Sequence, residues 1–165
     1  MRSNIISLSG VQGSGKTAVA KHLRTYIPEA IIYDGKFGFK KYLNNQQETG
    51  TVIIVEYASV ILFPDEWLDE RSIKRFAKCD LIDRKYFQKG KHFFLDIQSE
   101  MTQYERLLKR HNGIDNGYIQ LMRKEYVHRT QYLRMLSDKG YFTKVIIVDE
   151  KSIDKITEEI MEAIT

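Results

Sequence analysis

Five short apolar runs alternate along the chain with longer segments of helical spacing. The runs are rich in Ile, Val, Leu and Phe, and they are nearly continuous in apolarity rather than alternating with polar residues. Such runs are typical of strands that are covered on both faces of a sheet. The sequence therefore predicts buried strands at Asn4–Ser9, Ala30–Tyr33, Thr51–Glu56, His92–Ile97 and Thr143–Val148.

The segments between these runs have the spacing of amphipathic helices. At the C-terminal end, isoleucines recur every three or four residues from Ile153 to Ile164, and Ser152 before them is a favourable N-cap. Regular alternation of strands and helices predicts an α/β fold with a parallel sheet between helix layers, although spacing leaves the strand order open. The expected helices are Lys16–Tyr26, Phe37–Gln47, Asp65–Lys89, Glu100–Arg110, Gly117–Lys139 and Ile153–Ile164.

Length and composition indicate an ordinary globular protein with one domain over residues 1–165. The chain has 42% hydrophobic and 29% charged residues, with no repeat and no Pro/Gly-rich linker. A single cysteine, Cys79, excludes an internal disulfide, and no apolar run suggests a signal peptide or a membrane span. We therefore expect a cytoplasmic protein without a membrane partner.

A formal net charge of +4 makes the chain modestly basic. Basic residues gather at 84–92, 106–111 and 123–134, which suits a phosphate-bearing ligand and leaves nucleic acid open as a partner. Solvated helix faces explain the charge total alone more simply.

The segment Gly10-Val11-Gln12-Gly13-Ser14-Gly15-Lys16-Thr17 fits the phosphate-loop pattern G-x-x-x-x-G-K-[ST] at every fixed position. The setting also fits, because an apolar strand ends at Ser9 and a run of good helix formers follows Thr17. The sequence therefore predicts a site that holds the phosphates of ATP, with GTP as an alternative.

Each residue type in this loop has a physical reason. Gly10, Gly13 and Gly15 allow backbone angles that a β-carbon would obstruct, so that amides of the loop, including Ser14, converge on phosphate oxygens. The positive end of the following helix dipole points at the same anion. Lys16 is expected to reach the β- and γ-phosphates, and the Thr17 hydroxyl is expected to bind Mg²⁺.

A carboxylate at the carboxyl end of a strand usually completes a magnesium nucleotide site. Glu56, Asp96 and the pair Asp149-Glu150 each follow an apolar run, and Asp34 follows the second run. The last pair also resembles the signature of mechanical ATPases, although both acids have a simpler role at the start of the final helix. Spacing alone leaves the choice among these acids open.

From the loop onward, the order of parts resembles the P-loop nucleoside and nucleotide kinases, above all the thymidylate kinase and deoxynucleoside kinase group. Tyr118–Tyr126 is similar to the helix after the lid in thymidylate kinases. His92–Ile97 and Tyr104–Arg110 are similar to the fourth strand and the arginine-bearing entry to the lid, and Val145–Asp149 with the Ser152 helix is similar to the last strand. The resemblance implies a three-layer P-loop NTPase fold with a five-stranded parallel sheet and a short lid around 106–117.

The resemblance also implies roles for individual residues. Arg106 and Arg110 would neutralise the phosphoryl group in transfer, because an arginine fork can grip two phosphate oxygens. Glu56 would act as a base or bind a metal-bound water, and Asp34 and Arg123 would contact the acceptor.

The sequence departs from this group after the third strand. The group has an Asp-Arg or Glu-Arg-Ser signature there, whereas this chain has Glu56-Tyr57, which keeps the acid and places Tyr57 beside the acceptor without the arginine. Arg71 is a candidate substitute, although it belongs to an expected helix surface. Room for a single helix, Phe37–Gln47, between the second and third strands also predicts a trimmed cover over the acceptor.

Three functions fit these features. The first is a Mg²⁺-ATP-dependent kinase of a nucleoside or a nucleoside monophosphate, because phosphoryl transfer depends on positioning and on neutralisation of charge. The second is a kinase of polynucleotides or other large acceptors, and the third is a nucleotide-gated switch. A homodimer built on segments such as Asp65–Lys89 is a further expectation.

Overall fold

The computed structural model describes residues 4–34, 50–55 and 89–165. The expected helix Phe37–Gln47, nearly all of Asp65–Lys89, and the site candidates Glu56, Tyr57 and Arg71 lie outside these residues. The described elements, in chain order, are β1 Asn4–Ser9, α1 Lys16–Tyr26, β2 Ile31–Tyr33, β3 Thr51–Val55, β4 Lys91–Asp96, α6 Glu100–Arg110, α7 Gly117–Asp138, β5 Lys144–Ile147 and α8 Ile153–Ile164.

The five strands form one parallel sheet in the order β2-β3-β1-β4-β5. In the register, Leu8 of β1 lies beside Val55 of β3 and Phe93 of β4. This confirms the predicted α/β fold with a five-stranded parallel sheet. Because β1 is the central strand, the loop that follows it emerges between the carboxyl ends of β3 and β4.

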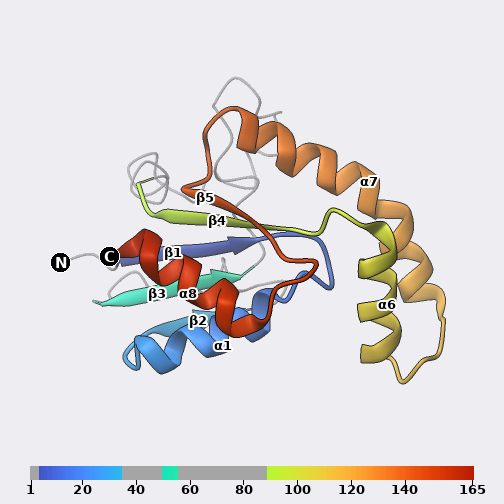
Figure 1. Cartoon of the computed structure of the whole chain (residues 1–165), viewed down its shortest axis with the longest axis horizontal. Helices are drawn as coiled ribbons and strands as arrows, with labels where there is room; N and C mark the ends of the chain where they lie inside the picture. Colours follow the sequence, from blue (N-terminus) through green and yellow to red (C-terminus); the bar gives the residue numbers. More distant parts are fainter. Residues whose placement is uncertain (1–3, 35–49, 56–88) are drawn as a thin grey trace, which may run out of the picture.

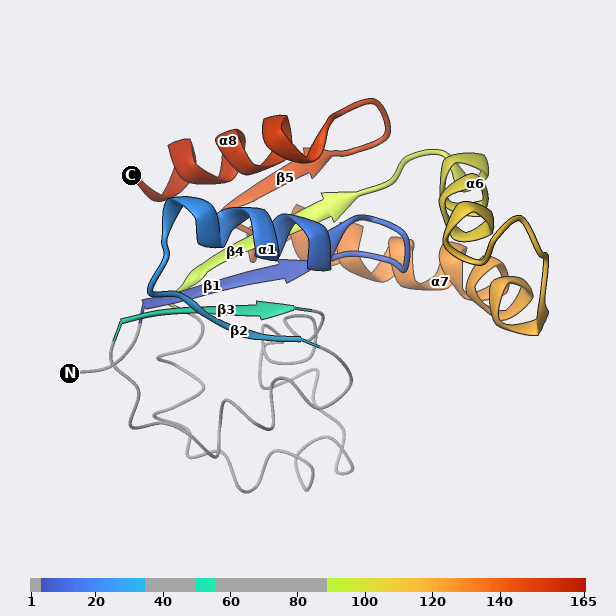
Figure 2. The ribbon, with the colours of Figure 1, turned by 90° about the horizontal axis from the view of Figure 1, so that it is seen from below.

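Helices cover both faces of the sheet. The apolar stripes of α1 and α8 pack on one face, with Leu23 and Ile160 fully buried there, and the opposite face holds Phe94 against Leu133 and Leu136 of α7. Figures 1 and 2 show α1 and α8 together on one side and α7 on the other. In the described ranges, none of the helices combines the length and apolarity that a bilayer crossing requires.

Helix α6 lies beyond the carboxyl ends of the strands and forms a hairpin with α7 (Figure 1). Leu107 of α6 packs with Ile119 and Met122 of α7, which holds the two helices together. Residues 111–116 connect them, and the Asn116 side chain caps α7 by accepting from the Ile119 N–H. The predicted lid region around 106–117 is therefore the end of a helix followed by a tight turn.

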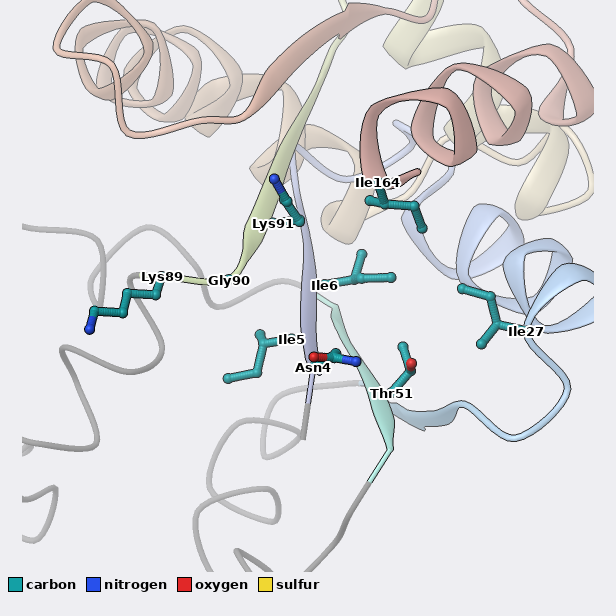
Figure 3. A pocket seen from close by; sticks show the side chains of 9 residues that line it. All are labelled: Asn4, Ile5, Ile6, Ile27, Thr51, Lys89, Gly90, Lys91 and Ile164. Atoms are coloured by element: carbon teal, nitrogen blue, oxygen red, sulfur yellow. The ribbon is translucent and has the colours of Figure 1, made fainter. Parts of the chain in front are cut away.

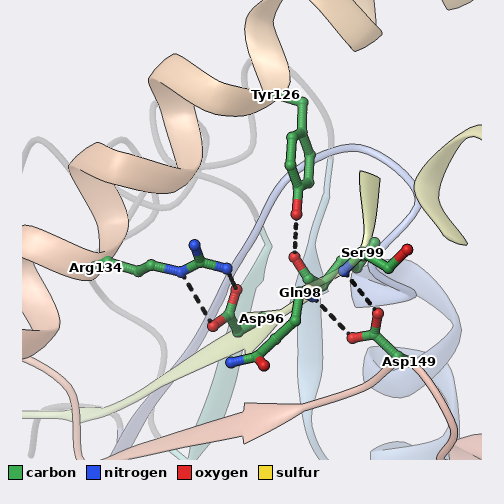
Figure 4. Close-up of polar contacts among 7 residues, drawn as sticks. Asp96, Gln98, Ser99, Tyr126, Arg134 and Asp149 are labelled. Atoms are coloured by element: carbon green, nitrogen blue, oxygen red, sulfur yellow. Dashed lines mark hydrogen bonds and ion pairs between the residues drawn. The ribbon is translucent and has the colours of Figure 1, made fainter. Parts of the chain in front are cut away.

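Polar contacts attach α7 to the end of β4 (Figure 4). The Asp96 carboxylate is 6% exposed and lies 3.1 Å from Nη2 and 3.4 Å from Nε of Arg134. The Tyr126 hydroxyl donates to the Ile97 carbonyl. These contacts give the buried Asp96 carboxylate a counter-charge and the Ile97 carbonyl a hydrogen-bond donor. Both lie at the carboxyl ends of the strands, where the phosphate loop also lies.

We expect Arg134→Met to lower the free energy of unfolding by about 2 kcal/mol, because it leaves the buried Asp96 carboxylate without its counter-charge. Urea denaturation would measure this change. Arg129→Met is the matched control, because Arg129 pairs with Glu125 one helical turn away on an exposed surface, where the cost is about 0.5 kcal/mol or less. Equal losses in the two variants would contradict the prediction.

Candidate phosphate-binding site

The predicted loop connects the end of β1 to the start of α1, at the centre of the sheet. Gly13 and Gly15 have φ angles of 88° and 91°, which side chains rarely adopt. At Gly10 the constraint is space, because a β-carbon would lie 2.6 Å from both the Leu95 carbonyl oxygen and Ser14 Oγ. The three glycines therefore occupy positions where the loop could not keep this path with a side chain.

The N-terminus of α1 lacks the side-chain cap that the other described helices have. Helices α6, α7 and α8 are capped by Ser99, Asn116 and Ser152, whose side-chain oxygens each accept a backbone N–H of the first turn. Helix α1 begins instead after Gly15, which has no side chain to accept from these groups. The positive end of the α1 dipole, which no side chain caps, therefore favours an anion at this position.

Lys16 lies inside the loop. Its side chain is 5% exposed, and its Nζ donates to the carbonyls of Gly10 at 2.8 Å and Val11 at 2.9 Å. The ammonium of this first residue of α1 is thus held against the carbonyls of the loop. Ser14 Oγ is also buried, and within the described residues it has no hydrogen-bond partner.

Thr17 and Asp34 lie side by side next to the loop. Thr17 Oγ1 donates to Asp34 Oδ2 at 2.8 Å, so the end of β2 meets the first turn of α1. A hydroxyl that gives its proton to a carboxylate keeps its lone pairs for another partner. Two hard oxygen donors next to a phosphate loop suit Mg²⁺, which prefers such ligands and retains several waters.

Helix α6 packs directly against the loop, which the sequence analysis did not anticipate. Gln103 is 1% exposed and its Nε2 donates to the Gln12 carbonyl at 3.0 Å. One turn later, Arg106 donates from Nη1 to the Gly13 carbonyl at 3.2 Å and from Nη2 to the Val148 carbonyl at 2.8 Å. Gln103 lies four residues before Leu107, on the buried side of the helix. A polar residue at such a position in an apolar stripe is a signal in the sequence that could have identified Gln103 as a functional candidate.

The other predicted arginines lie further along the hairpin. Arg110 is the last residue of α6 and is exposed. Arg123 of α7 stacks on the Tyr104 ring, 4.2 Å from its centroid. The Tyr104 hydroxyl donates to Asp115 at 2.9 Å, and this hydrogen bond raises the pKa of Tyr104. The structure therefore brings Arg106 to the loop and leaves Arg110 and Arg123 at the turn end of the hairpin.

Two of the strand-end acids have structural partners. Both carboxylate oxygens of Asp149 accept backbone N–H groups, from Gln98 at 2.8 Å and Ser99 at 2.9 Å (Figure 4). Asp149 thereby joins the end of β5 to the start of α6. The sequence suggested a role for this acid at the start of α8, whereas its hydrogen bonds are at the start of α6. Since Asp96 is paired with Arg134, Asp34 is the strand-end carboxylate that the described residues bring to Thr17.

A hollow of about 420 Å³ lies at the end of the sheet opposite to the phosphate loop (Figure 3). Its lining includes Asn4, Thr51 and Lys91, the first residues of β1, β3 and β4. Parallel α/β sheets bind ligands at the carboxyl ends of their strands, so the phosphate loop and not this hollow marks the candidate site.

The parallel sheet with a glycine loop after its central strand is a fold that solved structures of P-loop kinases share. A YorR protein from Bacillus subtilis, in complex with phosphorylated GDP, is 20% identical with a TM-score of 0.63, over 98% of this chain and 95% of that one. Shikimate kinase from Acinetobacter baumannii in complex with shikimate is 15% identical with a TM-score of 0.60, over 98% and 92%.

A deoxyadenosine kinase from M. mycoides, with dCMP and dCDP bound, is 14% identical with a TM-score of 0.56, over 97% of each chain. These structures share the fold, which agrees with the resemblance to nucleoside and nucleotide kinases. No family model matches the sequence, and no curated protein matches it.

We expect Gly10→Ala to weaken nucleotide binding at least tenfold and to lower the free energy of unfolding by about 1–3 kcal/mol. The added β-carbon would overlap the Leu95 carbonyl oxygen, so that the loop must shift. Calorimetric titration with Mg²⁺ nucleotide and urea denaturation would measure the two effects. Gly117→Ala is the control, because a β-carbon at the first residue of α7 meets open space; comparable losses there would refute the steric explanation.

Proposed function

We propose that this protein is a Mg²⁺-ATP-dependent phosphotransferase that moves the γ-phosphoryl group to a nucleoside or a nucleoside monophosphate. The observation that supports it best is the uncapped N-terminus of α1 at the end of a glycine loop, with Lys16 held over that loop. Such an arrangement binds a polyphosphate through backbone N–H groups, a helix dipole and one ammonium.

Different groups among the described residues would bind the phosphates of the donor nucleotide and neutralise their charge. Amides of the loop and of the first turn of α1 bind and orient the phosphates, and Lys16 neutralises charge on the β- and γ-phosphates. Because phosphoryl transfer needs little covalent chemistry from the protein, positioning and charge neutralisation supply most of the acceleration. The same groups accept GTP phosphates equally well, so the choice of base depends on residues other than these.

Thr17 and Asp34 are the residues that would hold the metal. A Mg²⁺ ion held by these residues would supply positive charge that offsets the negative charge of the phosphates. Asp34 accepts the Thr17 proton at 2.8 Å, which fixes the direction of the Thr17 lone pairs and adds a negative charge beside them. Asp34 therefore serves the metal in this proposal, and its expected contact with the acceptor becomes secondary.

The arginines of α6 have different tasks. Three backbone carbonyls, those of Gly13, Val148 and Asp149, hold the Arg106 guanidinium, so its main role is to tie the loop to the end of β5. Arg110 is exposed at the entry to the turn, and it is the arginine with the freedom to reach the group in transfer. Residues 111–116 would then act as a short lid in a single-domain enzyme.

The acceptor class rests on the resemblance to deoxynucleoside and thymidylate kinases and on the fold shared with a deoxyadenosine kinase. Shikimate kinase shares the fold as well, so the acceptor panel must include small hydroxylated compounds that are not nucleosides. Glu56 as base, and Tyr57, Arg71 and Arg123 as acceptor contacts, complete the proposed site.

The proposal predicts release of ADP that depends on a nucleoside or a nucleoside monophosphate when the protein is incubated with MgATP and a panel of these compounds, with small hydroxylated compounds that are not nucleosides included for comparison. Chromatography of the products would identify both the acceptor and the donor. We expect Lys16→Met to lower the rate about 100-fold or more, because it removes a charge from the transferring phosphates. Lys21→Met, an exposed lysine on the same helix, should keep the rate of the wild type; a panel without any active acceptor would refute the proposal.

We expect Asp34→Asn to raise the Mg²⁺ concentration for half-maximal activity about tenfold. Asparagine still accepts the Thr17 hydroxyl but lacks the negative charge that favours the cation. Mg²⁺ titrations of the initial rate would measure the shift, with the exposed Asp138→Asn at the end of α7 as the control. If the Mg²⁺ dependence of Asp34→Asn matched that of the control, Asp34 would have no part in metal binding.

A further inference from the structure

Gln103 is a buried polar residue at a position where an amphipathic helix normally carries an apolar one. It is 1% exposed at the end of the first turn of α6, and its Nε2 donates to the Gln12 carbonyl at 3.0 Å. The assignment of nitrogen and oxygen is unambiguous, because a backbone carbonyl can only accept. Its Cγ also lies 3.6 Å from where a β-carbon on Gly13 would be, so the side chain lies against the loop along its length.

The direction of the Gln12 carbonyl fixes the direction of another group. A trans peptide unit is planar, and its C=O and N–H point in opposite directions. When Gln103 holds the Gln12 C=O toward α6, the N–H of Gly13 in the same peptide unit points away from α6. Within the described residues no hydrogen bond uses this Gly13 N–H, which leaves it for a phosphate oxygen.

The neighbouring peptide unit is held in the same manner. Arg106 donates to the Gly13 carbonyl at 3.2 Å. The N–H of the same peptide unit belongs to Ser14, and it donates to the Val11 carbonyl at 3.2 Å. Two consecutive peptide units are therefore oriented from one helix. Glycine at position 13 has no conformational preference of its own that would keep these units in place.

We infer that Gln103 is a positioning residue, which keeps the Gly13 amide directed at the nucleotide phosphates by holding the Gln12 carbonyl. The inference rests on the proposed function, because it assumes that the loop binds a polyphosphate. It assigns a donor-binding task to α6, a helix that otherwise contributes the lid arginine. Movement of the α6–α7 hairpin would thereby change how the loop grips the donor.

Two substitutions separate the nitrogen of Gln103 from its oxygen. Gln103→Met keeps the length and removes both polar atoms, while Gln103→Glu keeps the shape and an oxygen but has no donor for the Gln12 carbonyl. We expect both variants to bind MgATP about tenfold more weakly by calorimetry, as suits the loss of one orienting hydrogen bond. Gln120→Met is the matched control, because Gln120 donates to Asp115 within the hairpin and is exposed.

A second measurement reports on the loop without any nucleotide. The amide ¹⁵N shift of Gly13 responds to the hydrogen bond on the Gln12 carbonyl, since both belong to one peptide unit. In ¹H–¹⁵N spectra of the nucleotide-free protein, we expect the Gly13 resonance to move in Gln103→Met and in Gln103→Glu and to stay in place in Gln120→Met. Circular dichroism would verify that each variant is folded.

The outcomes separate this inference from the proposed function. Weaker MgATP binding together with a displaced Gly13 resonance in both Gln103 variants supports the positioning role. An unmoved Gly13 resonance, or a Gln103→Glu variant that binds MgATP as the wild type does, overturns it. If the wild type itself does not bind MgATP, the proposed function fails, and the Gly13 resonance still decides whether Gln103 holds the loop.

Discussion

The structure of the site depends on the backbone N–H groups at the start of α1, which no side chain caps. A helix N-terminus normally satisfies these donors with a side chain, as Ser99, Asn116 and Ser152 do for α6, α7 and α8. Gly15 cannot do so, and it follows a loop whose glycines permit close approach of an anion. The resulting positive end lies at the centre of the sheet because β1 is the central strand.

Side chains that follow or pack against this loop hold it in place by hydrogen bonds to its carbonyls. Lys16 donates hydrogen bonds to the loop carbonyls of Gly10 and Val11. From α6, Gln103 donates to the Gln12 carbonyl and Arg106 donates to the Gly13 carbonyl. With its carbonyls engaged in this way, the loop turns the Gly13 N–H away from α6, and within the described residues no hydrogen bond uses that group. Preorganised donors of this kind favour charged groups because they need no reorganisation when the ligand arrives.

The strand-end acids illustrate how one residue type acquires different tasks in one fold. Asp96 balances Arg134, Asp149 accepts two backbone N–H groups of the β4–α6 connection, and Asp34 accepts the Thr17 hydroxyl. All three follow apolar runs, so their sequence contexts are alike. Only their partners in space distinguish a residue of the scaffold from one beside the phosphate loop.

The sequence by itself determined the elements and the loop. Helices α1, α6 and α8 begin and end at the predicted residues, because apolar periodicity and caps such as Ser152 are local properties. Strands β2, β4 and β5 differ from the prediction by one residue at one or both ends. The phosphate loop was equally local, because its glycines, Lys16 and Thr17 are consecutive. The tertiary structure alone decided the strand order, the pairing of Asp34 with Thr17 and the contact of Gln103 with the loop. These depend on residues up to 91 positions apart, and local periodicity carries no information on which distant polar groups will meet.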